Sequence, residues 1–191
     1  MNVDHHHTVS KGSFNTKAST GIGLANIITF SRLLIVPVLI YTILKEYTVI
    51  SAVLVVLAVL SDWLDGIIAR KYNAVTKHGE LLDPAVDKIF TISVLVAFVE
   101  MKYISTYLVF LIVTREMLVT WMRSVLVNKN IVVPASYLGK VKTTIQLIAI
   151  LLLSLKFIFL GNLVLWVSIA VAYISAYDYL KIFIKEKGWN L

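Results

Sequence analysis

The chain has 191 residues, of which 59% are hydrophobic and 15% charged, and its mean hydropathy is +0.85. So apolar a composition excludes an ordinary water-soluble domain and predicts a membrane protein. The net charge of +7 indicates that basic residues lie near anionic lipids and phosphorylated ligands. We expect no nucleic-acid partner, because soluble nucleic-acid-binding proteins are not so apolar. The absence of cysteine excludes disulfides, thiolate catalysis and cysteine-bound zinc.

The N-terminal residues 1–22 are polar and contain three consecutive histidines, His5 to His7. We expect them to be a tag-like or disordered leader outside the fold. Residues 23–191 are then one membrane domain. The segment 23–31 has polar residues among apolar ones, which predicts a short helix in the membrane interface before the first crossing.

Six apolar stretches follow, each ended by polar or charged residues. A hydrocarbon core about 30 Å thick requires roughly 20 helical residues for each crossing, and the chain has room for six. The stretches centre on Ile35, Val55, Val94, Leu111, Ile150 and Ala170. The predicted fold is therefore all-α, a polytopic membrane protein with six transmembrane helices.

Basic residues are unevenly divided between the expected loops. The loop after the second stretch, the loop after the fourth stretch and the C-terminal tail hold most of them, whereas the alternate loops hold little beyond Lys45, Lys102 and Lys156. By the positive-inside rule, both termini and the two basic loops are expected on the cytoplasmic side of the cell membrane.

Four aspartates lie at the ends of the second and third apolar stretches. Asp62 and Asp65 are three residues apart, and Asp83 and Asp87 are four apart, so each pair lies on one face of its helix. A short connection lets the two faces meet. Each buried acid costs about 2.5 to 3.5 kcal/mol in a membrane helix, so four together require bound cations. Oxygen ligands favour Mg²⁺ or Mn²⁺, and four carboxylates suffice for two ions, which suits cleavage of a pyrophosphate.

Small and basic residues surround the acids. Gly66 and Ala69 leave a strip without large side chains on which a nucleotide can lie, Arg70 can bind phosphate oxygens, and Gly79 permits a tight turn. Each has a purely structural alternative: Gly66 as a helix-packing glycine, and Asp83 as an N-cap before Pro84. Independent structural causes do not account for the whole spaced set.

The residues from Asp62 to Asp87 match D-x2-D-G-x2-A-R-x8-G-x3-D-x3-D at every fixed position. This resembles the signature of the CDP-alcohol phosphotransferase family. The resemblance implies a six-helix homodimer in the membrane, in which a CDP-linked donor loses CMP to an acceptor hydroxyl. It also implies that Asp62, Asp65 and Asp83 are metal ligands, and that Asp87 is both a ligand and the general base. The cytidine nucleotide would contact Asp62, Gly66, Ala69, Arg70 and Gly79.

Segments outside the signature resemble the bacterial members that transfer a phosphatidyl group from CDP-diacylglycerol to glycerol 3-phosphate. They are the stretches around Asn26 to Arg32, Thr114 to Arg123 and Leu138 to Thr143. Met117 departs from the phenylalanine that such enzymes often have.

The acceptor phosphate needs cationic partners. Arg115 and Arg123 are eight residues apart on one predicted helix, about 80° of rotation, so both can line one side of a cavity. Alternatively, Arg115 pairs with Glu116 or the aspartates, and Arg123 extends to the membrane surface. Lys140 and Lys142 are about 200° apart on a helix, so we assign Lys140 to the pocket and expect the other lysine to face lipid headgroups.

Other acceptors within the family, namely serine, inositol phosphate or a lipid headgroup, are the main alternatives. A divalent-cation transporter is an alternative from another class, although it has no use for Gly66, Ala69 and Arg70. Asp178, within the last apolar stretch, has no assigned role.

Overall fold

The computed structural model describes the backbone of residues 33–71, 77–128, 131 and 136–187, and their side chains except those of residues 62–84 and 186–187. The expected leader and interfacial segment therefore lie outside the described residues. The described residues form six helices and no strand. The first helix spans Leu33–Leu44. It is followed by α2 (Thr48–Lys71), α3 (Lys77–Glu100), α4 (Thr106–Asn128), α5 (Tyr137–Ser154) and α6 (Ile158–Lys187).

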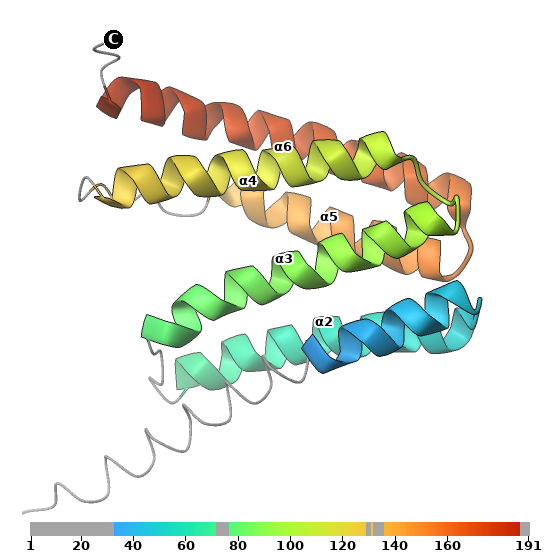
Figure 1. The fold of residues 1–191 in the computed structure, drawn as a ribbon. Helices are drawn as coiled ribbons and strands as arrows, with labels where there is room; N and C mark the ends of the chain where they lie inside the picture. The colour runs from blue at the N-terminus through green and yellow to red at the C-terminus, as the bar shows by residue number, and fades with distance from the viewer. Residues whose placement is uncertain (1–32, 72–76, 129–130, 132–135, 188–191) are drawn as a thin grey trace, which may run out of the picture.

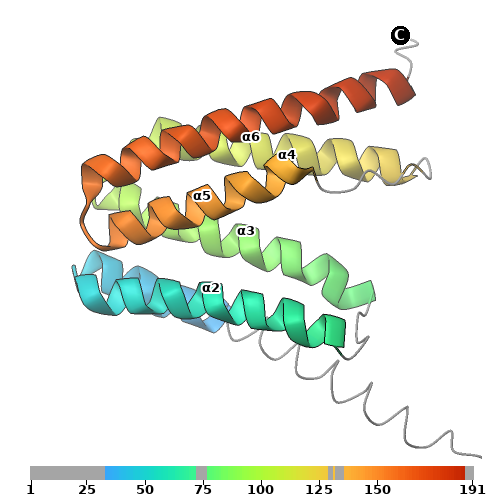
Figure 2. The ribbon, with the colours of Figure 1, turned by 180° about the vertical axis from the view of Figure 1, so that it is seen from behind.

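The helices form one bundle in which successive helices run in opposite directions (Figure 1). The first helix and α2 lie at one side of the bundle and α6 at the other, as the reverse view in Figure 2 also shows. At one end, which we call the hairpin end, short turns join the first helix to α2, α3 to α4, and α5 to α6. At the opposite end α2, α4 and α6 finish and α3 and α5 begin.

The three turns at the hairpin end share one geometry. Glu46, Lys102 and Lys156 have φ of 60°, 58° and 62°, the left-handed conformation that usually favours glycine. In each turn the next residue is aromatic, and its N–H donates to the carbonyl five residues earlier, which ends the preceding helix. These bonds are Tyr47 N to Thr42 O, Tyr103 N to Phe98 O and Phe157 N to Leu152 O, each 2.9 Å.

Polar contacts join the three hairpins to one another at this end. The Nζ of Lys156 lies 2.6 Å from Oε2 of Glu46, and the hydrogen bond raises the pKa of Lys156. The Nδ2 of Asn162 donates to the carbonyl of Tyr103 at 2.8 Å. The hairpin end is therefore tied across all three helix pairs.

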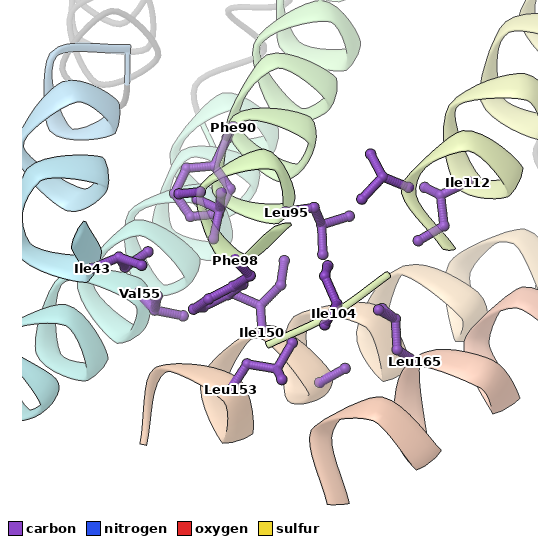
Figure 3. Close-up of a cluster of buried hydrophobic side chains, with 14 of the residues drawn as sticks. Ile43, Val55, Phe90, Leu95, Phe98, Ile104, Ile112, Ile150, Leu153 and Leu165 are labelled. Carbon is purple, nitrogen blue, oxygen red and sulfur yellow. The ribbon is translucent and has the colours of Figure 1, made fainter. Parts of the chain in front are cut away.

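The main hydrophobic core lies near the hairpin end (Figure 3). Phe98 and Leu153 are almost completely buried, and they pack with residues of the other helices. A second, smaller cluster joins α4 to α6 nearer the opposite end, through Met122, Leu126 and Phe183 among others. The bundle is thus packed tightly at one end, while α4 and α6 stay together along their length.

The outer surface of the bundle is strongly apolar. Phe110, Trp121 and Trp166 are each more than half exposed, as are many aliphatic residues. Two described helices, Tyr137–Ser154 and the part of α6 from Ile158 to Lys185, are long and apolar enough to cross a membrane. These features agree with an all-helical membrane protein.

Gly161 permits close contact between α5 and α6, and Gly161→Ala should destabilise this hairpin. A Cβ at this position would lie 2.6 Å from Cγ of Leu153 and 3.3 Å from its backbone nitrogen. Leu153 is fully buried and has no room to move aside, so we expect a loss of about 1–3 kcal/mol. Thermal unfolding in detergent, followed by tryptophan fluorescence, measures this. The exposed neighbour Leu160, replaced by alanine, is the control, and an unchanged Tm for Gly161→Ala would contradict the prediction.

Candidate active site

A cavity of about 550 Å³ opens at the end opposite the hairpin turns. Its walls are formed within residues 87–92 of α3, 112–123 of α4 and 139–147 of α5, with Tyr179 from α6. The side chains that bear on its chemistry are Asp87, Lys88, Thr91, Arg115, Glu116, Thr120, Arg123, Lys140, Lys142, Thr143, Gln146 and Tyr179.

The charge of these walls is predominantly positive. Among the described lining residues, five are basic and two are carboxylates. Ile92, Ile112 and Leu147 form an apolar floor deeper in the bundle. Such a site suits an anionic ligand, because cationic walls of low dielectric concentrate negative charge.

Glu116 is the centre of a buried ionic network. Its Oε1 accepts a hydrogen bond from Nη1 of Arg115 at 3.0 Å and another from Nζ of Lys142. The exposed fractions of the three side chains are 4% for Arg115, 10% for Lys142 and 15% for Glu116. One carboxylate thus holds two buried cations, leaving the network with a net positive charge beside the cavity.

Arg115 also joins α4 to α6. Its Nε donates to the carbonyl of Ala172 at 3.0 Å, and its Nη2 donates to Oγ of Ser175 at 3.2 Å. With the Glu116 contact, three of the five guanidinium N–H groups have protein partners among the described residues, and two remain available. The pairing of Arg115 with Glu116, the structural alternative above, is confirmed.

The network continues into the start of α5. Ser175 Oγ lies 2.8 Å from Oγ of Ser136, which caps α5 by accepting from the N–H of Gly139 at 3.0 Å. The hydroxyl of Tyr179 accepts from the N–H of Ser136 at 2.8 Å. Helix α6 therefore fixes where α5 begins, and with it the positions of Lys140 and Lys142.

Arg123 and Lys140 lie nearer the mouth of the cavity, and both are exposed. Arg123 is eight residues after Arg115, about 12 Å along the helix axis. Lys142 lies on the buried side of α5, so the expectation that it faces lipid headgroups is wrong. Both lysines line the cavity, because this wall covers more than one face of α5.

Asp87 is the one signature aspartate whose side chain is described, and it lines the cavity on α3. Lys88 beside it donates to the hydroxyl of Thr120 on α4, and that hydroxyl donates to the carbonyl of Glu116. These contacts connect the α3 wall to the α4 wall close to Asp87.

The other signature residues lie in helix segments whose side chains the structure does not describe. Asp62, Asp65, Gly66, Ala69 and Arg70 are in the C-terminal part of α2, while Gly79 and Asp83 are in the first turns of α3. These two helix segments lie at the same end of the bundle as the cavity (Figure 1). The suggestion that Asp83 is an N-cap is wrong, because α3 begins six residues earlier at Lys77.

The oxygen donors near this end suit a hard divalent cation. Asp87 lies in the cavity, and the backbone brings the segments bearing the other three carboxylates to the same end of α2 and α3. Within the side chains that the structure describes, no group of three metal-binding residues occurs. Three of the four expected ligands lie outside that part.

Lys142, Glu116 and Gln146 were not assigned to the pocket from the sequence. Lys142 and Gln146 are four residues apart on α5, the spacing of one helix face. A polar pair at this spacing within an apolar helix was the available signal.

Comparison with known proteins shows what the sequence of this chain resembles. A profile described as CDP-alcohol phosphatidyltransferase matches residues 22–174. A protein of Rickettsia felis named CDP-diacylglycerol--glycerol-3-phosphate 3-phosphatidyltransferase is 36% identical over 169 residues, covering 83% of this chain and 93% of its own length. A protein of Bacillus subtilis with the same name is 33% identical over 189 residues, covering 87% and 95%. A Mycobacterium tuberculosis protein named probable phosphatidylglycerophosphate synthase is 34% identical over 133 residues, covering 66% and 63%.

Proposed function

The chain belongs to the CDP-alcohol phosphatidyltransferase family, and from this premise we propose that it transfers the phosphatidyl group of CDP-diacylglycerol to glycerol 3-phosphate. The products are phosphatidylglycerophosphate and CMP, and the reaction belongs to phospholipid biosynthesis. The observation that carries the proposal is the predominantly basic cavity that contains Asp87 of the aspartate signature. The names of the relatives from Rickettsia felis and Bacillus subtilis support the choice of donor and acceptor.

The donor occupies the side of the site formed by α2 and α3. Two Mg²⁺ or Mn²⁺ ions would be held by the carboxylates of Asp62, Asp65, Asp83 and Asp87, where they supply positive charge for the pyrophosphate. Gly66, Ala69 and Gly79 leave space for the nucleotide, which also contacts Asp62. Arg70 neutralises phosphate oxygens of the donor. This arrangement is supported by the spacing of the residues and by the position of the two helix segments.

Asp87 accepts the proton of the attacking hydroxyl. As the acceptor oxygen forms its bond to the β-phosphorus, the bond from that phosphorus to the CMP oxygen breaks, and CMP leaves with the bonding electrons. A carboxylate at the cavity wall is suited to take the released proton. Asp87 thereby prepares the nucleophile for attack.

The phosphate of glycerol 3-phosphate binds to the cationic wall. Arg123 and Lys140 are exposed to the cavity mouth, and Arg115 contributes the N–H groups that its protein partners leave available. A dianion needs several such donors, whereas serine does not require them. The excess of basic residues therefore favours the phosphorylated acceptor.

The same proposal includes the membrane arrangement. Six helices cross the membrane, with the cavity and both termini on the cytoplasmic side, and two copies form a homodimer. The gathering of basic residues at the cavity end supports the sidedness. The exposed apolar surface supports contact with lipid and with a second copy.

A panel of acceptors tests the function directly. Purified protein with Mg²⁺ or Mn²⁺ and CDP-diacylglycerol should release CMP with glycerol 3-phosphate at least about tenfold faster than with serine, because binding the acceptor phosphate contributes to the rate. Inositol phosphate and a lipid acceptor complete the panel. Preference for another acceptor would refute the glycerol 3-phosphate assignment. Metal uptake into proteoliposomes without any CMP release would instead favour a transporter.

A further inference from the structure

Gln146 has a buried amide nitrogen that lacks a hydrogen-bond partner within the described residues. Its side chain is 4% exposed, and its Nε2 has no hydrogen bond within the described part of the chain. It also lines the cavity. A buried N–H donor without a partner destabilises the protein, so a bound ligand is expected to supply an acceptor when the site is occupied.

The position of Gln146 places it at the boundary between the polar and apolar parts of the cavity. It lies one turn, about 6 Å, beyond Lys142 on α5. Helical side chains lean toward the N-terminus of their helix, which for α5 is the direction of Lys142 and the cavity mouth. Gln146 therefore lines the cavity between the apolar residues Ile112 and Leu147 and the cationic side chains nearer the mouth.

The chemistry of an amide differs from that of the cations around it. Arg115, Lys142 and Arg123 offer only donors, which match the oxygens of a phosphate. An amide offers both a donor and an acceptor, which match a hydroxyl group that can accept and donate in return. A cavity with cations and an amide whose Nε2 has no partner within the described residues thus fits a small phosphorylated alcohol with a second hydroxyl.

We propose that Gln146 binds the non-reacting, secondary hydroxyl of the acceptor and sets acceptor specificity. This inference rests on the proposed function, and it adds a residue and a specificity rule to it. Gln146 contacts the acceptor and not the donor. The cations bind the acceptor phosphate, and the reacting hydroxyl faces Asp87. An acceptor without the secondary hydroxyl would leave the buried amide unpaired and bind less well.

Two acceptors that differ in one group test the proposal. Glycerol 3-phosphate and 1,3-propanediol monophosphate share a phosphate and a primary hydroxyl, and only the first has a secondary hydroxyl. The unmodified protein should show a kcat/KM at least about tenfold higher for glycerol 3-phosphate, since sites that bind a hydroxyl discriminate against its absence. The substitution Gln146→Met keeps the size of the side chain and removes the amide. In this variant the kcat/KM for glycerol 3-phosphate should fall until it is within about threefold of the kcat/KM for 1,3-propanediol monophosphate.

The control is Ser154→Ala, which removes another buried polar group from α5 at the hairpin end, where its hydroxyl donates to the carbonyl of Ile150. This variant should keep the acceptor preference of the unmodified protein. Equal losses with both acceptors in Gln146→Met would overturn the proposal by showing a structural role. No preference in the unmodified protein would overturn it without any variant, whereas no CMP release with either acceptor would refute the proposed function itself.

Discussion

Asp87→Asn is expected to lower the kcat for CMP release from CDP-diacylglycerol by about 10²- to 10⁴-fold, the usual contribution of a general base. The amide cannot accept the proton of the acceptor hydroxyl, and it is a weaker ligand for a hard cation than a carboxylate. The side-chain size is unchanged, so the fold should persist. Initial rates at saturating acceptor, together with Tm in detergent, separate loss of chemistry from loss of structure.

The chain offers a matched control for this substitution. Asp178→Asn makes the same chemical change on α6, where the aspartate is exposed and does not line the cavity. We expect its rate to stay within about twofold of the unmodified protein, as for most surface substitutions. If Asp87→Asn keeps its full rate while Asp178→Asn loses activity, the assignment of the base is wrong.

Glu116→Ala should lower the free energy of unfolding more than any other substitution predicted above. It removes the carboxylate that pairs with both Arg115 and Lys142, two cations with exposed fractions of 4% and 10%. Breaking a buried ion pair by removing one partner costs about 3–5 kcal/mol, because the remaining charge is buried and unpaired. Unfolding in mixed micelles at increasing denaturant, followed by tryptophan fluorescence, measures this cost.

A second substitution distinguishes charge repulsion from lost packing. In Glu116→Ala combined with Lys142→Met, one unpaired cation is removed as well, so part of the stability should return. Glu46→Gln, at the exposed ion pair with Lys156, provides the comparison and should change stability little. If the double variant is as unstable as the sum of its single variants, Glu116 does not act through Lys142.

The donor side of the site could be proposed from the sequence because the pattern that indicates it is local. The signature residues lie within 26 residues of chain, and helical spacing alone places Asp62 with Asp65 and Asp83 with Asp87 on shared faces. Their association with metal and nucleotide remains a prediction, since most of their side chains lie outside the described part. The all-helical fold was equally local, because long apolar stretches in lipid must satisfy their backbone hydrogen bonds internally.

The hairpin turns were not predictable in the same way. Each has a non-glycine residue in the left-handed conformation, Glu46, Lys102 or Lys156, where propensity favours glycine or asparagine. The packing of the helix pairs imposes this conformation. A charged residue followed by an aromatic one recurs at all three turns, but that pattern is too common to have been a signal by itself.

The sequence by itself determined the class of protein, the helical character and the spacing of the donor-side residues, since these depend on hydrophobicity and on contacts within a few turns. Only the tertiary structure decided that Glu116 would join Arg115 and Lys142, and that Arg115 would contact α6 some 57 and 60 residues away. It also placed Lys142 at the cavity and left Nε2 of Gln146 there without a partner among the described residues. Such contacts arise from the rotation and depth of each helix, which the packing of the whole bundle sets.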